Sequence, residues 1–446
     1  MSAKWKFVFL FLFLLAFRTA FGLSAPFFSP DELQTYLIGL KCFTTGAWPY
    51  FGPDLIVTET GFQSQIPGSL EGLLIGLPFH LLPIPETPFI LVNLLSLAGL
   101  ALFSLYGSKR LPEIPFWFIF SWLALLPWNL HESVNIINPS YLLFGSCLFF
   151  VGFLESLPNL SLRWLSPTIA YALMGFGLFW DMQFHFSWIL LPPFILASTV
   201  SRGWFWIKTR KSSSVISVSS VVNPFLGFAG GSVIPLAFLV PTFLKYGLSP
   251  GASGMSLSVG FNSENFLSFF TILARFFSLP SYELLRFIGL NTVERIQFLK
   301  DPWIIVPGGF LVLLGILQVP ALVLWGWFKD PRHPDARTLQ RWTLAAFLLV
   351  WVSFWFTSKP PAAHIYYILL PLVAIYSLYI VSRLASNRLW RILGVICLGA
   401  NLWFETGYMV QKLKIQSLYL NRPLVVKSIQ EKDYRILAER RTGSIY

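Results

Sequence analysis

Two adjacent carboxylates, Asp31 and Glu32, stand near the N-terminus, directly after an apolar run. The stretch Ser29-Pro30-Asp31-Glu32 fits the start of a helix, with Ser as the N-cap, Pro at the first position and acids in the first turn. A carboxylate at such a position can also take a proton from an acceptor hydroxyl. We keep both interpretations, because a helix start is also a rigid mount for a catalytic group.

A second set of polar residues lies in short segments between apolar runs further along the chain. In chain order they are His131 with its neighbour Glu132, Asp181, Gln183, His185, Lys359 and His364. Singly, each has a structural explanation: a solvated turn, a helix end, an interfacial hydrogen bond, or a lysine that extends toward the headgroups. Together they supply acids, imidazoles and a cation, which are the groups that move protons and neutralise a departing phosphate.

The composition indicates the class of protein in which these polar residues lie. The chain has 446 residues, of which 55% are hydrophobic, 17% aromatic and only 12% charged. Soluble domains carry about a quarter charged residues, and a charge at the centre of a membrane helix costs roughly 2.5–3.5 kcal/mol. The sequence therefore predicts an all-α, polytopic membrane protein whose charges lie in loops, at interfaces or in a polar cavity.

Apolar runs near the required length of about 20 residues divide the chain into about eleven predicted spans. They are 5–23, 88–106, 115–130, 139–155, 166–180, 186–200, 222–243, 303–327, 342–357, 364–382 and 391–408. We expect one transmembrane domain over 1–408, a first external loop at 24–87, a second long external loop at 244–302 and an extracytoplasmic tail at 409–446. Segment 68–83 is short and contains Glu71, so we expect an interfacial helix there.

The net charge of +12 gives the orientation. With the N-terminus in the cytoplasm, most Lys and Arg residues in loops fall inside, as the positive-inside rule requires. This also explains the positive charge without a nucleic-acid partner. The same topology places the polar residues listed above on the extracytoplasmic face of a bacterial inner (plasma) membrane.

Four stretches, in order, resemble the GT-C superfamily of polyprenyl-phosphate-sugar-dependent glycosyltransferases. They are "SPDELQTY", "FQSQIPGSLEGLLIGLPFHLL", "GFGLFWDMQFHFSWILLPP" and "SKPPAAHIYYILLPLVAIY". The likeness is greatest to the branch of protein O-mannosyltransferases and the lipid A aminoarabinose transferase. It implies a GT-C-like bundle with interfacial helices in the first external loop. It also implies Asp31 as general base, Glu32 as its neighbour, and Lys359 and His364 as contacts of the donor phosphate.

We therefore expect a glycosyltransferase that moves a sugar, with inversion, from a polyprenyl-phosphate donor to a lipid, glycan or protein hydroxyl. His185, Gln183, Asp181 and His131 are further candidates for binding substrate. No cofactor is required. Two adjacent acids can hold a divalent cation, but no third clear oxygen ligand follows them, so no metal is predicted. Two alternatives stay open: a transporter or flippase for a lipid-linked or polar substrate, and a non-catalytic scaffold.

Overall fold

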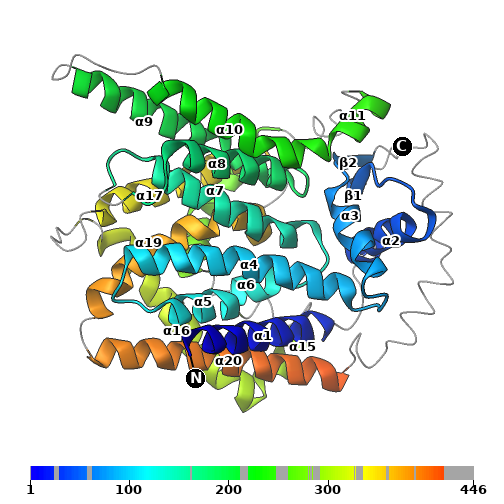
Figure 1. Cartoon of the computed structure of the whole chain (residues 1–446). Coiled ribbons are helices and arrows are strands. Elements are labelled where there is room, and N and C mark those ends of the chain that lie inside the picture. The colour runs from blue at the N-terminus through cyan, green and yellow to red at the C-terminus, as the bar shows by residue number, and fades with distance from the viewer. Residues whose placement is uncertain are drawn as a thin grey trace.

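The computed structural model describes most of the chain in a single helical bundle (Figure 1). The described residues are 2–24, 30–57, 63–160, 163–210, 219–247, 260–279, 281, 284, 292–325, 327, 335–357, 361–385 and 388–415. Lys359 and the tail from 416 onward lie outside them. The first helices and the strands are α1 (Ala3–Leu23), α2 (Pro30–Thr45), β1 (Phe51–Val57), β2 (Gln63–Pro67), α3 (Leu70–Gly76), η1 (Leu77–His80) and α4 (Thr87–Arg110).

The regular elements described in the middle of the chain are all helices. Its elements are α5 (Phe116–Leu125), α6 (Pro127–Glu132), η2 (Asn138–Tyr141), α7 (Leu142–Ser156), α8 (Pro167–Met182), η3 (Phe186–Leu190), α9 (Pro192–Arg210), α10 (Ser219–Ala237) and α11 (Val240–Tyr246). The later elements are η5 (Ser263–Ser268), α13 (Phe269–Ser278), α15 (Thr292–Leu299), α16 (Pro302–Trp325), α17 (Ala336–Phe354), α18 (Ala363–Tyr366), η7 (Tyr367–Leu369), α19 (Leu370–Ala385) and α20 (Arg388–Ile415).

Every predicted span coincides with one or more of these helices, which confirms a helical, multi-pass membrane protein. Within the described ranges, six helices are long and apolar enough to cross a membrane, or seven if the bent pair α10–α11 is one span. The other predicted spans are helical but shorter or more polar; for example, Pro127 separates α5 from α6. Crossing by those helices stays a prediction. The last helix among the described residues, α20, extends to Ile415, beyond the predicted boundary at 408.

Glycines bring α7, α8 and α10 into close contact near one edge of the bundle. Gly177 on α8 lies against the backbone of Gly145 on α7, and Gly227 and Gly231 on α10 lie against the backbone of α8 at Thr168 and Ala172. A side chain at any of these positions would overlap the neighbouring helix. Small residues are what allow membrane helices to approach this closely, so these contacts fix the position of α8 and of the turn that follows it.

The first loop forms a small domain at one end of the bundle, seen at the right of Figure 1. We call this end the first-loop end. β1 and β2 form an antiparallel hairpin, a feature that the all-α prediction lacked. The Tyr50 carbonyl accepts hydrogen bonds from Gly68 N (3.1 Å) and Thr242 Oγ1 (2.8 Å), and Ser69 Oγ donates to the Phe238 carbonyl (2.6 Å). These bonds attach the first loop to the break between α10 and α11.

The predicted interfacial segment 68–83 contains α3 and η1. Their apolar run, Leu70–His80, spans roughly 16 Å, about half of the thickness of the hydrocarbon core. It packs against α2 and exposes Leu77, Leu81 and Leu82. This is the geometry expected of a segment that lies at the interface and does not cross the membrane.

Arg18 lies in the C-terminal half of α1 and is fully buried. Its guanidinium donates to the Ala124 carbonyl (2.7 Å), to Ser133 Oγ (2.6 Å) and to Asn93 Oδ1 (3.2 Å). Ala124 is near the end of α5, where the helix break leaves carbonyls without a partner inside the helix. Arg18 therefore stabilises the break between α5 and α6 and fixes the position of α6, which carries His131.

Candidate active site

The carboxylate pair begins α2 at the first-loop end, as the sequence predicts. The structure separates the two acids: Asp31 is exposed, whereas the Glu32 residue is only 4% exposed. Both occupy the first turn, where the positive end of the helix dipole favours a negative charge. Asp31 is thus open to an incoming molecule, and Glu32 faces the protein.

The surroundings of Glu32 contain further polar groups from other elements. Glu32 and Glu71, which is 1% exposed, lie within electrostatic range of Tyr141 in η2. The ring of Tyr141 stacks on Phe184 with centroids 5.1 Å apart, and its carbonyl accepts a hydrogen bond from Trp180 Nε1 (3.0 Å). Tyr141 therefore connects the acids of the first loop with the end of α8.

Asp181 lies in the last turn of α8 and is completely buried. Neither carboxylate oxygen has a hydrogen-bond partner among the described residues. Its Oδ1 points at Gly145 on α7, where a methyl group would overlap it. A buried polar group without a partner is costly, and natural structures contain few of them. Asp181 is therefore a candidate for contact with a bound molecule.

Gln183 has one committed and one open side-chain atom: its Oε1 is buried without a hydrogen-bond partner among the described residues, so its contact with substrate stays a prediction. Its amide nitrogen donates to the Pro235 carbonyl (2.8 Å) and the Phe179 carbonyl (3.2 Å). Pro235 lies inside α10, close to the break that precedes α11. The side chain also packs directly against Gly68, whose φ is +142°. Gln183 thus joins α8, α10 and the first loop, and its nitrogen is already committed to backbone carbonyls.

His185 and His364 come together from two distant parts of the chain. Their rings are perpendicular, with centroids 5.8 Å apart. His185 caps η3: its Nδ1 accepts a hydrogen bond from Ser187 N (3.1 Å), which leaves Nε2 as the protonated nitrogen of the neutral ring. Burial, and secondarily His364, lower the pKa of His185 to about 3. At neutral pH this imidazole is uncharged and can donate a hydrogen bond through Nε2.

His131 on α6 lies beside two charged residues that the sequence analysis did not select. Its Nε2 is 3.8 Å from Glu405 Oε2, and Lys412 is within electrostatic range. Burial, and secondarily Lys412, hold the pKa of His131 well below its usual value. A signal for Glu405 was present in the sequence, because an acid inside a predicted span marks a candidate functional position. Lys412 had been assigned to the tail.

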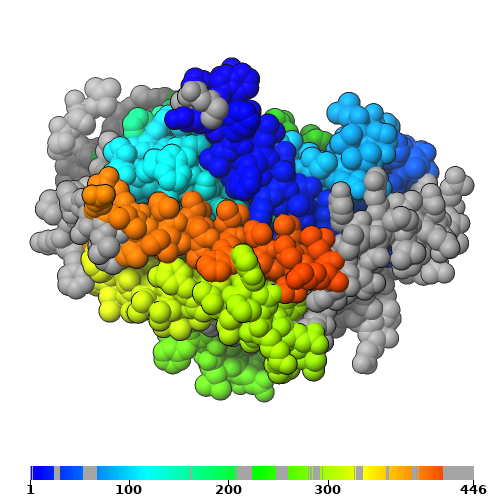
Figure 2. Space-filling model, turned by 90° about the horizontal axis from the view of Figure 1, so that it is seen from below, coloured from blue at the N-terminus to red at the C-terminus, as the bar shows by residue number. Residues whose placement is uncertain are grey.

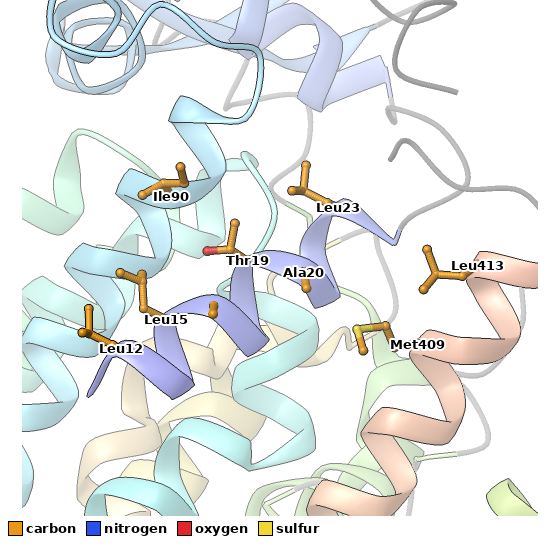
Figure 3. A pocket seen from close by; sticks show the side chains of 9 residues that line it. Leu12, Leu15, Thr19, Ala20, Leu23, Ile90, Met409 and Leu413 are labelled. Atoms are coloured by element: carbon orange, nitrogen blue, oxygen red, sulfur yellow. The ribbon is translucent and has the colours of Figure 1, made fainter. Parts of the chain in front are cut away.

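An apolar groove of about 540 Å³ runs between α1, α4 and α20 (Figure 3). Its walls are Leu12, Leu15, Ala16, Thr19, Ala20 and Leu23 of α1, Ile90 of α4, and Met409 and Leu413 of α20. From Leu12 to Leu23 the groove follows α1 for roughly 16 Å. Figure 2 shows α1 and α20 together on one face of the molecule. The groove extends to Leu23, where the first loop begins.

The structure thus gathers most of the predicted site residues at the first-loop end, in two groups. One consists of Asp181, Gln183, His185 and His364 around the turn after α8; the other consists of Asp31, Glu32 and His131 with Glu71, Glu405 and Lys412. Tyr141 and Phe184 lie between the groups. In the part of the chain that is described, no three His, Cys, Asp or Glu residues are arranged to hold a metal ion.

Comparisons with known proteins give one finding. No protein-family model and no curated protein sequence matches the chain. Among solved structures, the chain is similar to ArnT from Cupriavidus metallidurans bound to undecaprenyl phosphate, with a TM-score of 0.48 and 15% sequence identity. The match covers 92% of this chain and 76% of that chain. A likeness at this level carries no argument about the reaction or the residues of this chain.

Proposed function

We propose that the protein is an integral-membrane glycosyltransferase that moves a sugar from a polyprenyl-phosphate donor to an acceptor hydroxyl on the extracytoplasmic side. The observation that carries the proposal is the concentration of buried acids and imidazoles at the first-loop end of an apolar bundle. A membrane protein buries such groups at a cost, so an intramembrane cluster is a functional candidate by default. The ordered motifs that resemble the GT-C superfamily supply the reaction class.

Asp31 is the proposed general base. Its exposed carboxylate takes the proton of the acceptor hydroxyl as the acceptor oxygen attacks the anomeric carbon. A new C–O bond forms on one face of the sugar while the bond to the phosphate oxygen breaks on the other, so the configuration inverts. The phosphate leaves with the electron pair and stays on its lipid. Glu32, buried behind Asp31, orients it or binds the acceptor.

The donor is held in two places in this proposal. An isoprenoid chain fits the chemistry of the groove between α1, α4 and α20, because its lining is almost entirely hydrocarbon. The phosphate contacts neutral His185 through Nε2, together with His364 and Lys359. Hydrogen-bond donors aimed at the phosphate stabilise the charge that develops on it as the sugar departs.

The direct test is incubation of the purified protein, in lipid nanodiscs, with a panel of polyprenyl-phosphate sugars. Release of lipid phosphate is read by mass spectrometry. We expect release with at least one donor, and a loss of about 100-fold or more for Asp31→Asn, as for removal of a general base. Glu113→Gln, an exposed acid outside the predicted site, is the matched control and should keep full activity.

Two outcomes would distinguish the role of Asp31 as base from the transferase activity itself. Full activity in Asp31→Asn would remove Asp31 as base while leaving the transferase in place. Release of lipid phosphate with none of the donors would count against the transferase itself.

Transport is a second candidate, favoured by the bend of 64° between α10 and α11. Broken helices are common in transporters, where the freed backbone binds the substrate. In this chain, however, carbonyls near the break accept bonds from Gln183 and Ser69. Movement of a lipid-linked sugar across proteoliposomes without a covalent product would establish transport in place of transfer.

A further inference from the structure

The second long loop contains a described segment, 260–279, that is bound to the end of α17. The backbone N–H of Asn262 donates to the Trp355 carbonyl (2.7 Å), and Asn265 Nδ2 donates to the Phe354 carbonyl (2.8 Å). Both carbonyls belong to the last turn of α17, where no further helical N–H groups are available to bind them. The start of the segment therefore caps α17 at its predicted extracytoplasmic end.

From this cap the segment runs inward along α17. The ring of Phe266 in η5 lies 4.4 Å from that of Trp355. Further along the chain, the ring of Phe269 in α13 lies 4.9 Å from that of Trp351 and 5.1 Å from that of Phe347. The distance from Trp355 to Phe347 along α17 is roughly 12 Å, more than a third of a hydrocarbon core of about 30 Å. If α17 crosses the membrane as predicted, α13 begins inside the apolar layer.

The opposite face of the segment is exposed and becomes apolar with depth. Ser263 and Glu264 are exposed beside the end of α17, where the segment starts. Deeper along the segment, the large exposed side chains are Leu267 (86%) and Phe270 (75%). A charge at the entrance followed by large apolar groups is the order in which a chain passes from the headgroups into the acyl chains.

This apolar face is continuous with the faces of two helices of the bundle. α13 packs against α16, which is long and apolar enough to cross the membrane, and against α17. The exposed rings of Phe261, before η5, and Phe356, after α17, are 6.3 Å apart. Large apolar side chains are also exposed along both helices: Leu313, Ile316 and Leu317 on α16, and Leu348 and Val352 on α17. The surface that lipid covers on these helices thus extends over α13.

The inner end of α13 is enclosed by protein. The helix ends at Ser278, and the next residue, Leu279, has a φ of +61° and is 1% exposed. Non-helical backbone at membrane depth is tolerated where protein buries it. Arg275 Nη1 donates to the Pro361 carbonyl (2.7 Å), and the ring of Phe276 lies 6.1 Å from that of Tyr366. The end of α13 therefore packs against α18, the helix that carries His364.

We propose that η5 and α13 form a membrane-inserted segment, which enters the bilayer along α17 and contacts lipid acyl chains through Leu267 and Phe270. The second long loop is then part of the lipid-facing surface and not only a solvent-exposed connection. The proposal goes beyond the proposed function, because it concerns where the segment lies and depends on no transfer reaction.

The test measures where spin labels on this segment lie relative to lipid and water. The full-length protein, with Cys42, Cys147 and Cys397 replaced by Ala, is labelled in nanodiscs at Leu267→Cys or Phe270→Cys. Collision of each label with oxygen, which concentrates among acyl chains, is compared with collision with a water-soluble nickel chelate. We expect the ratio of oxygen to nickel collisions to equal that at Leu313→Cys on α16. At Glu264→Cys, the matched control in the same segment, nickel collisions should dominate.

Dominant nickel collisions at Leu267→Cys and Phe270→Cys would overturn the proposal, because both positions would then face water. Little collision with either reagent would also overturn it, because protein and not lipid would cover the segment. If the cysteine-free protein does not fold, the wild type can be labelled with a phospholipid that carries a diazirine on its acyl chain. Peptides containing Leu267 and Phe270 should then be modified to the same extent as the α16 peptide containing Leu313, and absence of modification would contradict the proposal.

Discussion

The two ends of the helical bundle handle buried charge in opposite ways. At the end opposite the first loop, Arg110 of α4 donates to Glu155 of α7 (2.8 Å) and lies 3.6 Å from Asp335. Glu155 Oε1 also accepts from Tyr106, and its Oε2 accepts from the backbone N–H groups of Trp164 and Leu165. At the first-loop end, Asp181 is equally buried, yet its carboxylate accepts no hydrogen bond from any described residue.

The contrast distinguishes a buried acid that stabilises the fold, Glu155, from a buried acid that is a candidate for binding a molecule, Asp181. Both oxygens of Glu155 accept two hydrogen bonds each, so this buried carboxylate is fully satisfied, and its bond to Arg110 joins α4 to α7. Asp181 makes no such contribution to the fold. Buried polar groups that lack hydrogen bonds are expected mainly at functional sites. Asp181 is such a group, and it lies at the end that carries the predicted site. Four predictions follow from the contrast, in order of decreasing effect on stability.

Breaking the network around Glu155 should have the largest effect. Arg110→Met leaves Glu155 and Asp335 buried without their cation, and removing one partner of a buried ion pair costs about 3–5 kcal/mol. We expect a strongly lowered melting temperature in detergent, measured by fluorescence-detected size-exclusion after heating. Lys109→Met, a change at the exposed neighbour, should melt like the wild type. Equal melting of the two variants would show that the network does not stabilise the bundle.

The junction between the first loop and α8 should come next. Gly68 has φ +142°, and a methyl group there would lie 2.9 Å from Gln183 Cγ, so Gly68→Ala should cost about 2–3 kcal/mol. Gly46 also has a positive φ, +67°, but nothing lies within 4 Å of an added methyl group. Gly46→Ala should therefore cost only about 1–2 kcal/mol. Reversal of this order in thermal unfolding would contradict the packing of Gly68 on Gln183.

Asp181→Asn should distinguish Asp181 from Glu155 most clearly, because we expect it to change activity more than stability. The amide has the same shape, and no hydrogen bond to a described residue is lost, so we expect a stability change within about 1 kcal/mol. Transfer should fall about tenfold or more if Asp181 contacts a substrate. Glu155→Gln is the counterpart at the other end: it should lower stability while the folded fraction keeps its turnover. The reverse pattern would place the functional charge at the opposite end.

The smallest effect near neutral pH should come from His185. Its pKa in the folded protein is about 3, below the unfolded value of 6.5, so the unfolded chain binds a proton that the folded protein does not. Stability is therefore unaffected above about pH 6.5 and falls as the pH drops toward 3, by about 1 kcal/mol at pH 6. His185→Gln should remove this part of the slope, and His80→Gln, at an exposed histidine, should not. Identical slopes in the two variants would contradict the burial of a neutral His185.

Most of the fold could be predicted because the length of each apolar run can be counted directly from the sequence. Every predicted span proved helical, and the apolar run Leu70–His80 within segment 68–83 is shorter than a membrane span, so its interfacial position stays a prediction. The hairpin of β1 and β2 was missed because Pro53 and Asp54 are unfavourable in strands. Pairing with β2 and attachment to Thr242 on α11 stabilise it, and both depend on residues remote in sequence.

The candidate site could be predicted only in part. The residue types of Asp31, His185 and His364 drew attention to them, and the two histidines are in contact. The burial of Glu32 depends on how α2 packs in the folded chain, which no local pattern encodes. Gln183 stays a predicted substrate contact: its nitrogen binds carbonyls of α8 and α10, and its Oε1 has no hydrogen-bond partner among the described residues. Lys359 lies outside the described residues, so its role stays a prediction.

The central claim is that a polyprenyl-phosphate sugar reacts at the first-loop end. It is tested most directly by cross-linking the protein to a donor that carries a photoreactive group on its sugar, and mapping the modified peptides. We expect labelling of α2, α3 and the turn between α8 and α9, abolished by an excess of unmodified donor. Competed labelling confined to the end that contains Arg110 and Glu155 would contradict it.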